Sequence, residues 1–450
     1  MSATAQLAQF IAAAGEAPLP APVVAAAKVA ILDGVASLLA GATQPVAALV
    51  SRYVRAMGGE AVCRVAGQDY RTSPAFAAFA NGVFLHCLDF EIQGDPPTHG
   101  TSAVLPAALA LGEWQGASGR RLIAAYVVGW EVQARLRRAT AHAELRGFHP
   151  PGLFGPLGAA AASAVMLGLE APQVRMALGI AASHTGGLTA NTGTMVKATH
   201  PGAAARTGVE AALLAREGFI SHQAILEAPQ GYIETLFGGA CNWEELTRGL
   251  GTTFGLVDPG FIIKRYPAHI ALQWPIEAVR MLRQRYGLHL DEVETLEVEV
   301  PAARAAYLRP VPASGLEGKF SFAYGAAVAL VREEVDIDAF SDAVYASPAV
   351  QAALRKVRVR PNPAIPADLR RTWAVARAKT TDGRALSYTC HRFPGAFGEP
   401  LPRPEHHAKF RACAGRLLAP AQVAQLLATL EALEELPDLR ALGALLAPGA

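Results

Sequence analysis

The chain has 450 residues, longer than a single hydrophobic core usually supports, so two domains are expected. Hydrophobic residues make up 52% of the sequence and charged residues only 17%, with 40 basic residues, 38 acidic residues and a net charge of +2. No long basic run and no basic stripe interleaved with aromatic residues occurs, which argues against nucleic acid as a partner. The high apolar content predicts a large core and a subunit interface as well.

Cysteine usage and the first segment indicate the compartment. The cysteines form no C-x-x-C pair and are odd in number, which favours a reducing cytoplasm: Cys63, Cys87, Cys241, Cys390 and Cys413. No cationic segment leads into a signal-like apolar run. The most apolar early stretch, residues 21–40, contains Lys28 and Asp33, so it predicts a buried helix rather than a membrane span. We therefore expect a cytoplasmic protein with no membrane partner.

From residue 3 to about residue 251 the pattern is helical, with Ala- and Leu-rich segments separated by Gly, Pro or Asn. Residues 158–182 are rich in small side chains, which suits helices that pack closely in the interior, and residues 206–216 repeat this composition.

The pattern changes near residues 256–260. Residues 293–300 end in an alternation that predicts a strand, and residues 357–360 alternate likewise. Asp382-Gly383 lies between two strand-like runs, residues 373–380 and 385–390, and indicates a hairpin turn. Helical patterns at residues 273–286 and 324–332 lie among these strands.

After Pro404 a stripe of leucines at helical spacing predicts a return to helix: Leu426, Leu427, Leu430, Leu433 and Leu436. The predicted fold is mainly α. A large all-α helical domain is formed by both chain ends, residues 1–255 and 400–450, and a smaller α+β domain, residues 256–399, is inserted between them.

Most of the chemistry-bearing side chains lie in four short segments. In the first, Asp89 and His99 bracket a loop rich in Gly, Asp and Pro. If the loop folds back, the carboxylate could hold one ring nitrogen of His99 and raise the basicity of the other, as a general base requires. The alternative is an Asp that merely caps or turns the backbone.

The second segment runs from Phe148-His149-Pro150 through three glycines into an Ala-rich helix. Its helix N-terminus suits an anion such as a carboxylate, although close helix packing explains the glycines equally well. Because no Walker A sequence is present and no strand leads into these glycines, nucleotide binding is disfavoured.

The third segment places Lys197 and His200 in a small-residue loop between apolar helices. A lysine there is costly to desolvate unless it meets an anion, and the alternative is a side chain that reaches solvent. The fourth segment, residues 264–269, gathers Lys264, Arg265 and His269 at the domain boundary, where clefts often form. Solvated charges in a boundary turn are the alternative.

Metal and serine chemistry are not expected. His86 and Asp89 have helical spacing and His406 adjoins His407, but no H-E-x-x-H motif or Cys/His cluster occurs, and lysines near the predicted site would repel a cation. The segment 116–119 is not a G-x-S-x-G elbow and predicts a helix–helix turn instead.

Motifs spread over almost the whole chain resemble the MmgE/PrpD family. They run in register along the sequence: Asn81-Gly82 to Asp89-Phe90, His99 with Val104-Leu105-Pro106-Ala107, Gly129-Trp130-Glu131-Val132, Leu167-Gly168-Leu169, Lys197-x-x-His200-x-Gly202, residues 208–215, Gly231-Tyr232, Lys264-x-Tyr266-Pro267-Ala268-His269 and Lys319-Phe320-Ser321-Phe322-x-Tyr324. Members include 2-methylcitrate dehydratase, cis-aconitate decarboxylase and iminodisuccinate epimerase.

The resemblance implies a helical domain with a smaller α+β domain, a homodimer, and action on a small di- or tricarboxylate without a metal or an organic cofactor. It implies a cleft lined by Asp89, His99, His149, Lys197, Lys264, His269 and Tyr324, with further substrate contacts from Gln93, Thr98, Met195 and His200. The dehydratase and decarboxylase members carry an Asp-Asp-Thr-Trp-like stretch where this chain has Glu91-Ile92-Gln93-Gly94. This departure argues against the specific 2-methylcitrate and cis-aconitate assignments and leaves the class of chemistry unchanged.

The predicted function is therefore a cofactor-independent lyase, either a dehydratase or a decarboxylase. An epimerase of a dicarboxylate and an inactive binding paralogue are the alternatives. Asp89 is predicted to orient a catalytic histidine, with His99 and His149 as acid/base groups above a floor made by Lys197. Lys264 and His269 are predicted to close the other wall of the cleft. Tyr324 is predicted to donate a hydrogen bond or a proton.

Overall fold

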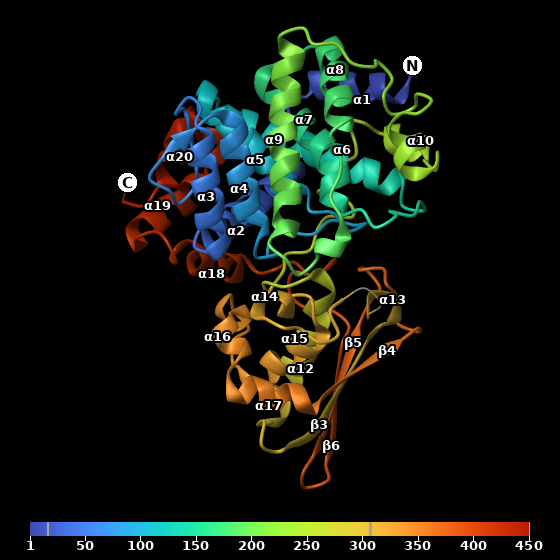
Figure 1. Ribbon diagram of the computed structural model, residues 1–450, viewed down its shortest axis with the longest axis vertical. Coiled ribbons are helices and arrows are strands. Elements are labelled where there is room, and N and C mark those ends of the chain that lie inside the picture. Colours follow the sequence, from blue (N-terminus) through green and yellow to red (C-terminus); the bar gives the residue numbers. More distant parts are fainter. Residues whose placement is uncertain (16–17, 306–307, 450) are drawn as a thin grey trace.

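The computed structural model describes residues 1–15, 18–305 and 308–449. Helices dominate it, which confirms the prediction of a mainly α protein. In Figure 1 most helices gather in a large upper part, and a four-stranded sheet with its own helices forms a smaller lower part. Each part has its own hydrophobic core.

The large part is built from helices of both chain ends. Its elements are α1 (Ala3–Ala13), α2 (Ala21–Gly41), α3 (Pro45–Met57), β1 (Cys63–Arg64), β2 (Arg71–Thr72), α4 (Pro74–His86), α5 (Gly100–Gln115), α6 (Gly119–Ala139), α7 (Pro150–Leu167), α8 (Ala171–Ala182), η1 (Thr189–Asn191), α9 (Val196–Arg216), α10 (Tyr232–Phe237), α11 (Trp243–Thr247), α18 (Arg403–Ala414), α19 (Pro420–Glu431), η4 (Leu433–Glu435) and α20 (Leu439–Leu445).

The C-terminal helices pack directly on the N-terminal ones. Helices α18 and α19 contact α2, and α20 contacts α5, so the red and blue ends of the chain lie together in Figure 1. The prediction of an all-α domain is wrong in one detail, because β1 and β2 pair as a short antiparallel sheet. Strands of two residues are too short to give an alternating signal in the sequence.

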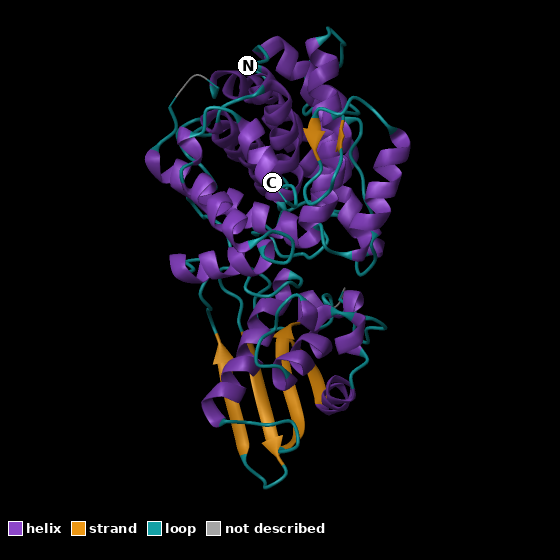
Figure 2. Cartoon of the chain, turned by 90° about the vertical axis from the view of Figure 1, so that its left-hand side faces the viewer, coloured by secondary structure: helices purple, strands orange, loops and turns teal. Residues whose placement is uncertain are grey.

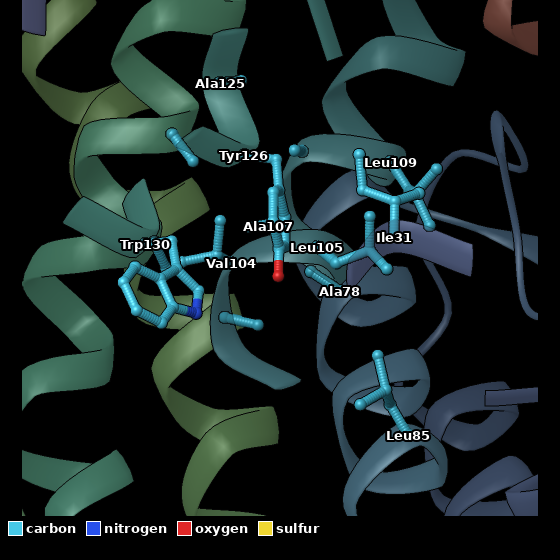
Figure 3. Close-up of a cluster of buried hydrophobic side chains, with 14 of the residues drawn as sticks. Ile31, Ala78, Leu85, Val104, Leu105, Ala107, Leu109, Ala125, Tyr126 and Trp130 are labelled. Carbon is cyan, nitrogen blue, oxygen red and sulfur yellow. The ribbon is translucent and has the colours of Figure 1, made fainter. Parts of the chain in front are cut away.

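Small residues let the central helices approach closely, as the composition of residues 158–182 predicts: a Cβ built on Gly208 of α9 would come within 2.4 Å of the backbone carbon of Ala159 on α7. Cα of Gly202 on α9 lies so near Gly82 on α4 that a Cβ built on Gly82 would come within 2.7 Å of it. Helix α7 packs on both α6 and α9. It is capped by Gly168, whose φ of 67° lies in the left-handed region that glycine adopts without strain. Figure 3 shows part of the core formed by α2, α4, α5 and α6, with Tyr126 and Trp130 among its side chains.

Two helices are long and apolar enough to cross a membrane by length and composition, Ala21–Gly41 and Pro150–Leu167. Their most apolar windows are 72% and 89% buried inside the protein. The prediction that residues 21–40 form a buried helix is thus confirmed, since α2 supplies much of the core between α4 and α18.

The smaller part comprises η2 (Ile270–Leu272), α12 (Gln273–Tyr286), β3 (Val293–Pro301), α13 (Ala302–Ala305), α14 (Gly315–Gly318), α15 (Phe322–Val331), η3 (Asp338–Phe340), α16 (Asp342–Tyr345), α17 (Pro348–Lys356), β4 (Val357–Asn362), β5 (Ala374–Thr380) and β6 (Ala385–Cys390). The strand order is β4-β3-β5-β6, with β4 parallel to β3 and the other pairs antiparallel. Figure 2 shows this sheet beside the helices of its own part. The predicted strands and the hairpin at Asp382-Gly383 are confirmed.

Four helix ends position the candidate site. Helix α4 ends at His86, α5 begins after His99, α7 begins after His149, and the first turn of α9 carries Lys197. The prediction that Lys197 lies in a loop is therefore wrong: the small residues around it belong to a helix packed against α4 and α7.

Candidate active site

Asp89 lies at the centre of a buried ion-pair cluster. Its φ of 52° is left-handed, a conformation that Asp tolerates better than most residues, and its side chain is 2% exposed. Oδ2 accepts a hydrogen bond from Nζ of Lys197 at 2.9 Å, and Oδ1 accepts one from Nζ of Lys264. Burial alone would raise the pKa of Asp89, but the two ammonium groups outweigh it and hold the pKa well below its usual value. The carboxylate is therefore ionised.

Glu91 is a residue of the site that the sequence does not predict, and His86 and Lys319 are two more. Glu91 is fully buried, and Oε1 accepts hydrogen bonds from Nδ1 of His86 at 2.5 Å and from Nδ1 of His99 at 2.9 Å. Burial acts to raise its pKa, but the two histidines lower the pKa well below the usual value. The predicted orienting role of Asp89 needs correction, because Glu91 holds His99 while Oδ1 of Asp89 lies 3.9 Å from Nε2 of His99.

The hydrogen bonds fix the state of His86. Its Nε2 lies 2.7 Å from the ammonium nitrogen of Lys197, which only donates, so Nε2 must accept and Nδ1 must carry the proton given to Glu91. His86 is thus a neutral imidazole. Burial lowers its pKa, and Lys197 lowers it further.

Four histidine rings lie in contact around this point. The ring of His86 lies 4.4 Å from that of His99 and 5.8 Å from that of His149, and Nδ1 of His149 lies 3.0 Å from Nδ1 of His200. Burial lowers the pKa of His99 and of His200 to about 4, and it holds the pKa of His149 well below its usual value. All four are therefore neutral near pH 7.

A cavity of about 330 Å³ opens beside the cluster, between the two parts of the molecule. Its polar wall includes His86, Asp89, Lys197 and Lys319. Lys319 is 4% exposed, and burial lowers its pKa to about 8. Apolar side chains form much of the remaining wall: Pro45, Val46, Leu316, Phe320 and Phe340. Lys197 and Lys264 both pair with Asp89, and Asp342 adds a second carboxylate to the lining. Lys319 makes no ion pair among the described residues, so its ammonium group is available to an anion in the cavity.

Lys264 and His269 lie behind this wall. Lys264 is fully buried and donates to both the carboxylate and the carbonyl oxygen of Asp89, the latter at 2.8 Å, so it acts on the cavity through Asp89. The ring of His269 lies 6.1 Å from that of Phe320, and burial holds its pKa well below the usual value. The predicted second wall is therefore made by other residues of the smaller part, Lys319 above all.

Tyr324 is placed differently from the prediction. Its hydroxyl donates to the carbonyl oxygen of Ala339 at 2.7 Å, and its ring packs near Phe340 in the core of the smaller part. The hydroxyl proton is occupied there, so the structure gives Tyr324 a core position rather than one on the cavity wall.

The predicted substrate contacts divide into two groups. Met195 lines the cavity and is 42% exposed. Gln93 and Thr98 are buried and bonded to each other through Nε2 of Gln93 and the carbonyl oxygen of Thr98 at 2.7 Å, and His200 is reached through His149. These three residues support the cluster from behind.

The cluster contains ligand types that could hold a metal. His86, His99 and His149 offer ring nitrogens, and Asp89, Glu91 and His99 form a second group, each within 4.8 Å. However, Lys197 occupies Nε2 of His86, and two ammonium groups occupy Asp89. A cation would have to displace these donors against their charge, so the arrangement fits an anion better.

A larger hollow of about 740 Å³ lies between α2 and the C-terminal helices. Its charged side chains pair with one another, as Nζ of Lys28 does with Glu434 at 2.6 Å and His407 with Glu431 at 2.9 Å. Arg120 also lines this hollow, and none of the predicted site residues does, so the smaller cavity beside the histidines is the candidate site.

Two family models cover this architecture. The MmgE/PrpD N-terminal domain matches residues 5–244, and the MmgE/PrpD C-terminal domain matches residues 266–435. This chain belongs to the MmgE/PrpD family. The chain is 32% identical to the cis-aconitate decarboxylases of Mus musculus and Homo sapiens, over 92% of its length and 87% and 88% of theirs. The cis-aconitate decarboxylase of Aspergillus terreus is 28% identical over 97% of this chain and 94% of its own.

These relatives place the MmgE/PrpD chain among enzymes of the carboxy-lyase class, which confirms the predicted lyase. They give no support to the epimerase alternative. The chain matches proteins named cis-aconitate decarboxylase although it has Glu91-Ile92-Gln93-Gly94 in place of the Asp-Asp-Thr-Trp-like stretch. That difference therefore does not separate the chain from these relatives. In the structure that stretch supplies Glu91, which holds His86 and His99.

Proposed function

We propose that this protein is a carboxy-lyase that releases CO₂ from a small unsaturated polycarboxylate such as cis-aconitate, without a metal or an organic cofactor. The observation that carries the proposal is the cavity wall, which combines the ammonium groups of Lys197 and Lys319 with apolar side chains that include Leu316 and Phe340. The names of the relatives support the same substrate class.

Such a wall suits decarboxylation. A carboxylate held against apolar side chains loses its hydration, whereas the CO₂ that it forms is neutral and needs none. The carbon–carbon bond breaks, and its electron pair spreads through the double bond onto a remaining carboxylate. Lys197 and Lys319 would stabilise that charge because they are already in place and poorly hydrated.

A proton must then be added to carbon in place of CO₂. We assign this step to the histidine cluster, in which His86 lines the cavity with its Nε2 bonded to Lys197, and the ring centres of His99 and His149 lie 4.4 and 5.8 Å from that of His86. Uptake of a proton by a ring becomes favourable when the carboxylates of the substrate enter beside it. Glu91 would stabilise the charged imidazole, and Asp89 would hold Lys197 in position.

The test is incubation of the purified protein with cis-aconitate in D₂O, with CO₂ release and proton NMR spectra recorded together. The expected result is one deuterium on carbon in the product for each CO₂ released, with the remaining substrate unlabelled. In a parallel incubation with a chiral dicarboxylate, deuterium on carbon without CO₂ release would instead identify an epimerase. Absence of both signals across a panel of di- and tricarboxylates would refute the proposal and favour a binding paralogue.

A further inference from the structure

A second group of buried charges lies behind the site, where α18 crosses α2. Asp33 on α2 is fully buried, and its Oδ1 accepts a hydrogen bond from Nζ of Lys409 at 2.6 Å. Nε2 of His406 lies 3.4 Å from the same oxygen. The side chain of Lys409 is 8% exposed, so this ammonium group is fixed by the protein rather than by solvent.

The other two donors of Lys409 go to backbone carbonyls. One hydrogen bond of 3.0 Å reaches the carbonyl oxygen of Phe90, and another of 3.0 Å reaches that of Lys264. The ammonium nitrogen also lies 3.8 Å from the centre of the Phe90 ring. An ammonium group has three donors, and all three are used.

These two carbonyls belong to the two segments that form the centre of the site. Phe90 lies between Asp89 and Glu91, and Lys264 donates to Asp89. The segments are about 170 positions apart and are also joined by a pair of backbone hydrogen bonds between Gln93 and Ile262, of 2.9 and 2.8 Å. Lys409 therefore bonds to both segments, and the position of these segments relative to each other determines the position of Asp89 relative to Lys264.

We propose that Lys409, held by Asp33, is a positioning residue that clamps these two segments and thereby fixes the carboxylate of Asp89 for Lys197. The C-terminal end of the chain thus contributes to the site without touching the cavity. A neutral side chain could not bond two carbonyls and a carboxylate at once with the same strength. The proposal rests on the proposed function for its kinetic test and is independent of it for its structural test.

The main variant is Lys409→Met, which keeps the length of the side chain and removes its donors. On its own, Lys409→Met would leave the buried carboxylate of Asp33 with only His406 beside it. Lys409→Met is therefore combined with Asp33→Asn, which removes that charge. Lys409→Arg keeps a cation beside Asp33, but its longer, planar group cannot reach the two carbonyls with the geometry of an ammonium group, and it serves if the double variant does not fold. Lys28→Met is the matched control, since Lys28 also joins α2 to the C-terminal helices through Glu434 and makes no contact with the site.

The first measurement is hydrogen exchange of the amides of Gln93 and Ile262, which does not depend on any substrate. Exchange there is expected to be about tenfold faster or more in the Lys409 variants, from the loss of charge-assisted hydrogen bonds. It should be unchanged in Lys28→Met. Unchanged exchange at both amides in the Lys409 variants, or an equal increase throughout the chain, would overturn the proposal.

The second measurement is kinetic. With cis-aconitate the Lys409 variants should lose about tenfold in kcat with little change in KM, because the cavity lysines remain. A rise in KM without a fall in kcat, or unchanged activity, would overturn the positioning role. If the unmodified protein fails to act on cis-aconitate or on any related acid, the proposed function fails, and the exchange rates still decide whether the clamp exists.

Discussion

Replacement of His99 by Gln should change the number of protons that the protein takes up when it unfolds in mild acid. Burial lowers the pKa of His99 from 6.5 to about 4, against the opposing effect of Glu91. At about pH 5 the unfolded imidazole is almost fully protonated and the folded one is almost fully neutral, a difference of about 0.9 proton. The contribution of His99 to the free energy of unfolding is therefore complete above pH 6.5 and is lost as the pH falls towards 4.

The cost to folding at about pH 5 is about 2 kcal/mol relative to about pH 7 for this one group. The assay is a back-titration of proton uptake when the protein is unfolded in guanidinium chloride, which needs no two-state assumption. The unmodified protein should take up about 0.9 proton more than His99→Gln at about pH 5 and about 0.2 more at about pH 7. Equal uptake by both proteins at pH 5 would refute the inference that burial keeps His99 neutral.

Three further predictions concern one residue of the site and two residues of the core. Glu91→Gln keeps the shape but removes the charge that holds His86 and His99, so kcat should fall about 10- to 100-fold with the fold retained, as steady-state kinetics and circular dichroism can show. Tyr324→Phe should lose about 1 kcal/mol of stability through its bond to Ala339 and keep its turnover; a large fall in kcat would restore a catalytic role. Gly82→Ala should lower stability by about 1–3 kcal/mol in thermal unfolding, and an unchanged Tm would contradict the close α4–α9 contact.

The sequence predicts the elements best where the signal is local. The alternation in β3 and the Asp382-Gly383 turn depend on neighbouring residues only, and both predictions are confirmed. The small residues around Lys197 predict a loop between apolar helices, yet tertiary packing against α4 and α7 makes that segment helical. Packing of this kind overrides local propensity and is not visible in the sequence.

Only part of the candidate site could be predicted, because some of its contacts depend on packing that the sequence does not reveal. Asp89, His99, His149 and Lys197 were found because each lies in a polar segment between apolar helices, and the structure brings them together. Glu91 was missed because it was read as a departure from a motif, although a buried acid between two histidines was a usable signal. Contacts such as that of Lys409 with the carbonyl oxygen of Lys264 have no sequence signature, because a backbone acceptor is the same at every position.

The most direct test of the central claim is the value of kcat/KM for CO₂ release from cis-aconitate by the unmodified protein and by Lys197→Met. The variant should fold, since Asp89 keeps its bond to Lys264. Loss of a charge-assisted contact to the substrate predicts a fall of about 10- to 100-fold or more. Equal kcat/KM in the two proteins would contradict the account, because the reaction would then take place without the cavity that Lys197 lines.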